Sequence, residues 1–252
     1  PAALNWTQAL GRAFSTPDQT VRSIIIANSV MFVLPLLLNP SLASLSANPF
    51  AMLSPDNRSL LLLGATGGIP IGQLGRWWSL ITASYLHGGI LHILFNMMAL
   101  RQITPLIYYE YGFARMAVIY TLGGALGFWI SYLAGIPFTI GASASVCSLI
   151  GAALYYGKSR GGAFGEAVYR QIGGWALGIF AFGFLMPGIN NWGHGGGLLG
   201  GVILGFFLGY RERRPETIVH NLLGWVCVVG TLAALGWGTV TGLVIYFSAM
   251  RG

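Results

Sequence analysis

The chain has 252 residues, of which 55% are hydrophobic and only 8% are charged, with a formal net charge of +7. Soluble domains carry about 25% charged residues, so this composition excludes an ordinary soluble domain and indicates an integral membrane protein. No basic face is interleaved with aromatic residues, so a nucleic-acid partner is not expected. The two cysteines lack the spacing of a zinc site or a disulfide framework, and neither a metal nor another cofactor is expected.

Seven continuous apolar runs are long enough to cross a bilayer as helices, which takes about 17–25 residues. They do not alternate as strands would, and an open sheet cannot lie in lipid. The runs cover residues 22–39, 88–107, 113–134, 141–157, 171–187, 193–210 and 220–248. The sequence therefore predicts an all-α, polytopic membrane helix bundle.

The remaining segments are assigned from their composition. Residues 1–21 lack the apolar core and cleavage site of a signal peptide, so we expect a cytoplasmic, interfacial segment. The link at 40–86 contains "SLLLLGATG" and "GRWWSLITASYLHGG", which is too apolar for an ordinary loop. We expect it to lie in the outer-leaflet interface, with a small extracellular subdomain as the alternative. Residues 211–252 would form a cytoplasmic linker and the seventh membrane helix.

The basic residues predict the orientation of the bundle. Ten fall on one side and three on the other, so the positive-inside rule places the N-terminus in the cytoplasm and the C-terminus outside. The ten are Arg12, Arg22, Arg101, Arg115, Lys158, Arg160, Arg170, Arg211, Arg213 and Arg214, and the three are Arg58, Arg76 and Arg251. Because we see no transit peptide, we expect a bacterial inner membrane.

The acidic residues exclude several chemistries, because all of them lie in predicted loops or at helix ends. They are Asp18, Asp56, Glu110, Glu166, Glu212 and Glu216. An intramembrane aspartyl protease needs acids at depth, and the His-Glu-x-x-His pattern of zinc proteases is absent. Ion-coupled transporters usually keep an acid inside the membrane, so a channel or transporter is disfavoured.

A serine and a histidine fall at the same predicted depth on different helices. Ser143 lies fifteen residues before Lys158, which is roughly 22 Å at the helical rise per residue. His194 lies seventeen residues before Arg211, or roughly 25 Å from the same face. A serine and a histidine on helices that touch are the minimum for nucleophilic catalysis.

Small residues favour contact between these two helices, although such stripes also serve plain helix packing. Glycines recur at every fourth position, at Gly193, Gly197, Gly201, Gly205 and Gly209. Ser143, Cys147 and Gly151 share one face of the other helix, and we expect the two faces to meet. Ser145 and Ser148 would point elsewhere and bond backbone carbonyls. Cys147 would fill space.

The second helix carries a further polar pair. His92 and Asn96 are four residues apart and share a face, where their N–H groups suit a developing oxyanion. His87 lies five residues before His92 and diverges from it, so the two histidines make a poor metal pair.

These motifs, taken together, resemble the rhomboid intramembrane serine proteases. The resemblance rests on "WW" in the long link, "HGGILHILFN", "GASA" and "GHGGGLLGG", in this order over about residues 20–210. It implies a six-helix catalytic core at residues 22–210, to which the seventh helix, at 220–248, is added at the C-terminal end. In the family, the fifth helix acts as a lateral gate, which corresponds here to about 171–191.

The resemblance also implies roles for individual residues. Ser143 corresponds to the nucleophile and His194 to its general base, a dyad without an acid. His92, Asn96 and the backbone N–H of Ser143 correspond to the oxyanion donors. Supporting positions are His87 in a water-holding cavity, Gly141 in the turn before Ser143, Gly197 and Gly201 at the helix contact, and Phe180, Phe182 and Phe184 on the gate.

Three positions depart from the family pattern. Ala144 replaces a glycine after the nucleophile, Cys147 replaces an aromatic residue that stacks on the histidine, and Trp78-Ser79 replaces a Trp-Arg pair. The implied function is a serine endopeptidase that cleaves transmembrane segments of other membrane proteins. The alternative is a weak or inactive rhomboid-like protein that binds transmembrane helices or stabilises a membrane complex.

Overall fold

The computed structural model describes residues 13–40, 44–45, 52–186 and 188–251. Seven long helices follow the predicted runs in order, which confirms the all-α membrane bundle. They are α2 (Pro17–Leu38), α5 (Ile90–Tyr111), α6 (Phe113–Leu133), α7 (Ser143–Arg160), α8 (Gly162–Leu185), α9 (Asn191–Leu208) and α10 (Ile218–Ala249). By length and composition, four of the described helices could cross a membrane, namely α2, α5, α6 and α10. Glycine and polar residues lower the hydropathy of the other three.

Helix α8 begins nine residues before the apolar run that predicted it. Its first turns carry Glu166 and Arg170, which form an ion pair one helical turn apart on the surface. The apolar run therefore marked only the part of the helix that is expected to meet lipid, and the helix itself continues into a polar extension.

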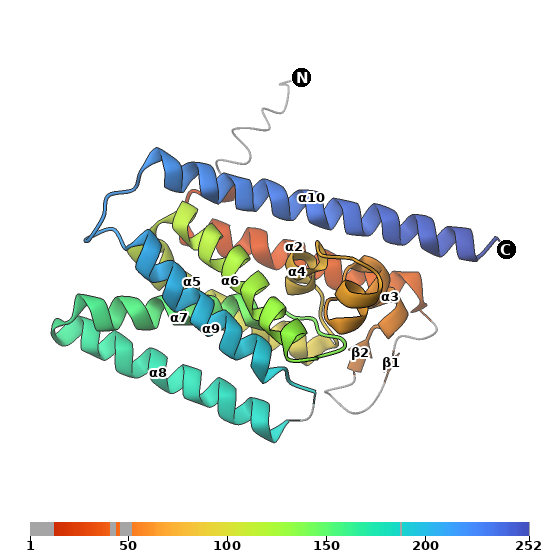
Figure 1. Ribbon diagram of the computed structural model, residues 1–252, viewed down its shortest axis with the longest axis horizontal. Coiled ribbons are helices and arrows are strands. Elements are labelled where there is room, and N and C mark those ends of the chain that lie inside the picture. The colour runs from red at the N-terminus through yellow and green to blue at the C-terminus, as the bar shows by residue number, and fades with distance from the viewer. Residues whose placement is uncertain (1–12, 41–43, 46–51, 187, 252) are drawn as a thin grey trace.

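Helix α7 lies inside the bundle. Figure 1 shows α10 along one side, α8 along the opposite side, and α6, α7 and α9 between them. Of the residues in α7, only Lys158 and Arg160, at its end, are exposed. The other six long helices all present exposed apolar side chains, such as Leu37, Leu177 and Ile218. In water such a surface would be an aggregation liability, whereas in a bilayer it is the expected exterior.

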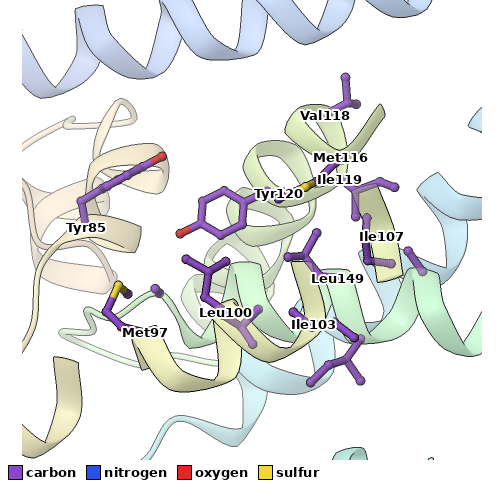
Figure 2. Close-up of a cluster of buried hydrophobic side chains, with 14 of the residues drawn as sticks. Tyr85, Met97, Leu100, Ile103, Ile107, Met116, Val118, Ile119, Tyr120 and Leu149 are labelled. Atoms are coloured by element: carbon purple, nitrogen blue, oxygen red, sulfur yellow. The ribbon is translucent and has the colours of Figure 1, made fainter. Parts of the chain in front are cut away.

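The apolar core lies where α5, α6 and α7 meet (Figure 2). Fully buried side chains from α5, α6 and α7 interlock there, including Leu100, Ile107, Ile119 and Leu149. Burying such a side chain stabilises the fold by about 1.5–3 kcal/mol where the alternative is water. Within lipid, close packing replaces that driving force, so contacts between helices matter more than area.

The link at 40–86 is folded, and its two short strands lie outside the seven apolar runs. It contains a small antiparallel pair, β1 (Ser44–Leu45) and β2 (Met52–Ser54), then α3 (Asn57–Leu63), the π-helix η2 (Gly68–Gln73), α4 (Ser79–Thr82) and the 3₁₀ helix η3 (Ala83–Tyr85). Helix α3 packs on α10, where a Cβ at Gly242 would lie 2.7 Å from the carbonyl oxygen of Leu62. These contacts hold the link against the bundle.

The two ends of the chain complete the bundle. Residues 1–12, part of the predicted interfacial segment, lie outside the described residues. Helix α2 begins at Pro17, where the side chain of Thr16 accepts a hydrogen bond from the Gln19 N–H. At the other end, buried Arg115 of α6 donates hydrogen bonds to the carbonyls of Arg214 and Pro215. This contact fixes the linker that leads into α10.

Asp56 joins the link to the end of α2. Its carboxylate caps α3 by accepting hydrogen bonds from the N–H groups of Arg58 and Ser59, at 3.0 and 3.1 Å, and from the Ser59 hydroxyl. Asn39, the C-cap of α2, donates to it at 3.1 Å. Burial alone would raise the pKa of Asp56, but these hydrogen bonds outweigh burial and lower the pKa below its usual value.

We expect Asp56→Ala to lower the free energy of unfolding by about 0.5–2 kcal/mol at neutral pH, the usual cost of a lost N-cap. Because the folded pKa is lowered, this stabilisation is complete above the unfolded pKa and is lost as pH falls below about 4. Thermal unfolding of both proteins in detergent, at neutral pH and near pH 3, measures the difference. Asp56→Asn, which keeps a capping oxygen, is the matched control. If the stability difference between the wild type and Asp56→Ala were as large at low pH as at neutral pH, the lowered pKa of Asp56 would be contradicted.

Candidate active site

Ser143 is the first residue of α7, at the point where this central helix begins. The residue before it, Ala142, provides no side-chain cap. The first N–H groups of a helix have no partner within it, and the helix dipole makes this end positive. The Ser143 hydroxyl therefore lies beside free backbone donors, in a position that favours a negative charge.

Gly141 shapes the turn that leads into α7. Its φ of +123° is one that side chains rarely adopt, and its N–H donates to the carbonyl of Ala83 at 2.9 Å. A Cβ here would lie 2.6 Å from Nε2 of His92 and 3.7 Å from Oγ of Ser143. Glycine at this position thus leaves room for the His92 imidazole, and the Ser143 hydroxyl lies near the same point.

The hydrogen bonds of His92 orient its ring. The Gly88 N–H donates to Nδ1 at 3.2 Å, so the proton of the neutral imidazole is assigned to Nε2. The Nε2–H is the group that faces Gly141 and Ser143. One turn later, the Asn96 amide donates to the His92 carbonyl at 2.8 Å and keeps a second N–H free. Asn96 is buried.

His87 is fully buried beside this pair. Its ring centroid lies 5.0 Å from that of His92, with the rings nearly perpendicular. Neither ring nitrogen has a hydrogen-bond partner within the described residues. A buried imidazole without partners is costly, which makes this end of the site a natural place for ordered water.

A network of hydrogen bonds fixes the start of α9, which carries His194. Asn190 caps the helix by accepting from the Gly193 N–H at 3.0 Å. Its amide also donates to the Ser131 hydroxyl of α6 at 2.7 Å and to Thr139, in the segment before α7, at 3.1 Å. His194, 7% exposed, is therefore held relative to both neighbouring helices. Its Nδ1 has no partner within the described part of the chain.

Helices α7 and α9 touch through backbone atoms. A Cβ at Gly197 would overlap the carbonyl of Ala144, and one at Gly201 would overlap the carbonyl of Ser148. In return, Gly151 lies against the carbonyl of Leu198. The predicted contact between the two glycine-bearing helices exists, and Gly151 of the predicted face takes part in it. The backbones of Ala144 and Ser148, which were not predicted, also meet α9 there.

The first turns of α7 and α9 thus run side by side, with Ser143 on one and His194 on the other. No hydrogen bond joins the two side chains within the described residues, and the Ser143 hydroxyl has no other partner there. Hydrogen bonds between catalytic groups are often long before substrate binds and tighten only in the complex. The arrangement therefore suits a serine and base that close on a substrate.

The other polar residues of α7 are engaged elsewhere. Ser148 donates to a backbone carbonyl, as predicted, namely that of Ile119 on α6 at 2.8 Å. Ser145 instead pairs with the hydroxyl of Ser84 at 3.1 Å, so the prediction that it bonds a backbone carbonyl is wrong. Cys147 is a buried free thiol. Ser143 is therefore the one serine of the first two turns whose hydroxyl is not committed to packing.

The predicted gate residues on α8 separate into two groups. Phe180 lies edge-on to the His194 ring, with centroids 6.5 Å apart. Phe182 and Phe184 are exposed, at 46% and 81%. An aromatic ring from α8 therefore lies edge-on beside the imidazole of His194.

The sequence analysis missed the residues that position the site. Asn190 precedes a helix as an N-cap should, and this local signal was available. The bridge between Thr66 and Thr139, with hydrogen bonds of 3.1 and 2.8 Å, had no such signal because it joins segments far apart in the chain. It anchors the segment before Ser143 to the folded link.

The fold and this site define a class: a helical membrane bundle with a serine and a histidine on adjacent helices. The rhomboid domain model matches residues 74–211. RHOMBOID-like protein 7 of Arabidopsis thaliana is 30% identical, over 92% of this chain and 85% of its own length. RHOMBOID-like protein 6, mitochondrial, of the same plant is 30% identical over 84% and 73%. Rhomboid protease GluP of Bacillus subtilis is 33% identical over 62% of this chain but only 31% of its own length.

The chain belongs to the rhomboid family, whose members here include proteins named as proteases and others named as rhomboid-like. Membership fixes the membrane-embedded helical domain and the hydrolase class at a coarse level.

Proposed function

We propose that this protein is an intramembrane serine endopeptidase that cleaves transmembrane segments of other membrane proteins. The observation that carries the proposal is the placement of an unbonded Ser143 at the positive end of α7, beside the Nε2 of His92. The α7–α9 contact then supplies a histidine, His194, at the same level.

In the proposed mechanism, His194 takes the proton from the Ser143 hydroxyl as its oxygen attacks the carbonyl carbon of the scissile peptide bond. The tetrahedral intermediate collapses to an acyl-enzyme, and His194 gives the proton to the leaving amine. A water molecule, deprotonated by His194, then attacks the ester and releases Ser143. The unpartnered nitrogens of His87 are suitable for holding that water near the site.

The developing oxyanion would receive three donors. They are the Nε2–H of His92, the free amide N–H of Asn96 and the backbone N–H of Ser143. Removal of one such donor from a serine protease typically lowers kcat by about 10²- to 10³-fold. Among the described residues no carboxylate orients His194, so the histidine depends on packing with Phe180 and on the α9 cap for its position.

Substrate would enter between helices. Helix α8 suits a lateral gate, because it packs mainly on α7 and little on α9, with its second half widely exposed. Its closest contact with α7 is at the far end, where Gly157 and Gly165 meet. Movement of the Phe182–Phe184 end would thus leave the α7 contact in place.

The orientation and location are part of the proposal. The distribution of basic residues favours an N-terminus in the cytoplasm and a C-terminus outside. A bacterial inner membrane stays a prediction, since relatives come from a plant as well as from a bacterium.

Labelling with a fluorophosphonate in mild detergent tests the proposal, because the probe reacts only with an activated serine. We expect the wild type and Ser248→Ala, a matched control at an exposed serine of α10, to be labelled equally. Ser143→Ala and His194→Ala should remain unlabelled while showing the wild-type melting temperature. Labelling that survives Ser143→Ala would show that the nucleophile is assigned wrongly.

A second candidate is an inactive rhomboid-like protein that binds transmembrane helices. It is favoured by the open Ser143–His194 pair and by the thiol at Cys147 where the family pattern has an aromatic residue. A folded wild type that resists the probe, and binds a transmembrane peptide without cutting it, would support this candidate over the protease.

A further inference from the structure

A cavity lies on the far side of the bundle from α8, between α2, α6 and α10. Its volume is about 100 Å³, and Tyr85 of η3 is among its lining residues. The walls are mostly apolar, with Ile24, Met116 and Leu235 among them, and no charged side chain of the described residues lines it. Leu232, at 53% exposure, stands at its edge, so the cavity reaches the surface that faces lipid.

Two buried hydroxyls in this cavity have no hydrogen-bond partner in the described chain, namely those of Tyr120 and Thr231. They are 3% and 6% exposed. Figure 2 shows Tyr120 reaching from α6 toward Tyr85, beneath α10. Tyr85 is a polar neighbour of Thr231 and Asn28 is a polar neighbour of Tyr120, but neither pair forms a hydrogen bond of good geometry.

Thr231 differs from three other threonines of the long helices. Thr20, Thr104 and Thr241 each donate to the carbonyl four residues before them, which is the usual arrangement for threonine in a membrane helix. Thr231 could satisfy its hydroxyl in the same way and does not. A buried hydroxyl without a partner is unfavourable, and lipid supplies no water to bond it.

We propose that this cavity binds the head of a neutral, hydroxyl-bearing lipid, such as a long-chain alcohol or an acylglycerol. The ligand hydroxyl would accept a hydrogen bond from one of the Tyr120 and Thr231 hydroxyls and donate one to the other. The absence of a lining charge disfavours a carboxylate or phosphate head. A cavity of this size holds a hydroxyl and a few carbons, and the rest of the chain would leave past Leu232 into the bilayer.

Photo-crosslinking in nanodiscs tests this proposal. The probes are hexadecanol and hexadecane, each with a diazirine near one end. We expect the alcohol to label the α6 and α10 segments at the cavity several-fold more than the alkane does. Thr231→Val and Tyr120→Phe should each weaken this labelling by about 3- to 10-fold, the range expected for one hydrogen bond inside a membrane.

Thr241→Val is the matched control, because Thr241 is on the same helix but outside the cavity and already bonds its own helix. It should label as the wild type does. Ala117→Leu, which fills the cavity, should abolish labelling, and its melting temperature will show that it folds. Equal labelling by the alkane, or labelling unchanged in Thr231→Val and Tyr120→Phe, would overturn the proposal. So would a folded wild type that neither probe labels, which would leave water as the occupant.

Discussion

His194→Ala is expected to lower kcat by about 10⁴- to 10⁶-fold, and Ser143→Ala by a similar factor. If the two residues act as one unit, the loss of either stops proton transfer to and from the attacking oxygen. The double variant Ser143→Ala/His194→Ala should therefore be no slower than the poorer single variant. The measurement is cleavage, in proteoliposomes, of a single-span reporter with a small residue before the cut and helix-breaking residues after it.

The same assay distinguishes a base from a residue that only supports the fold. Asn96→Ala should lower kcat by about 10²- to 10³-fold, since two oxyanion donors remain. Combined with Ser143→Ala or His194→Ala, it should lower kcat no further, because no oxyanion forms without attack by Ser143. If His194→Ala and Ser143→Ala instead lowered the rate by factors that multiply in the double variant, the two residues would act independently and the dyad would be wrong.

The order of the helices could be predicted from the sequence because each long helix contains one continuous apolar run. The start of α8 could not, since an ion pair between Glu166 and Arg170 extends the helix past the apolar segment. The short helices of the link also escaped prediction. They depend on a local cap at Asp56 and on the Thr66–Thr139 bridge, and the bridge partner lies more than seventy residues away.

The candidate site was predicted as a set of residue types rather than as a geometry. Depth along two helices was sufficient to match Ser143 with His194. The contacts of Gly197 and Gly201 with the carbonyls of Ala144 and Ser148 were not predicted, because helical spacing describes side chains and not backbone carbonyls. The bonds of Asn190 to Ser131 and Thr139 join three segments, and only a folded chain brings them together.

Gly201→Ala is expected to destabilise the protein and to disable the site from a distance. Alanine favours a helix over glycine by about 1 kcal/mol, so propensity alone predicts a more stable protein. Packing predicts the opposite, because the new Cβ would overlap the Ser148 carbonyl and force α7 away from α9. Overpacking typically costs about 1–3 kcal/mol, and a displacement of about 1 Å at a catalytic group can cost about 10²-fold in rate.

Gly195→Ala provides the control on the same helix. Its Cβ would meet only the Phe180 ring, at 3.7 Å, which is an ordinary contact. This variant should keep or raise the melting temperature, whereas Gly201→Ala should lower both the melting temperature and the rate of reporter cleavage. Equal melting temperatures for the two variants would mean that α7 and α9 can move apart at little energetic cost. In that case close backbone packing could not be what holds Ser143 level with His194, and the hydrogen bonds of Asn190 would have to set their alignment.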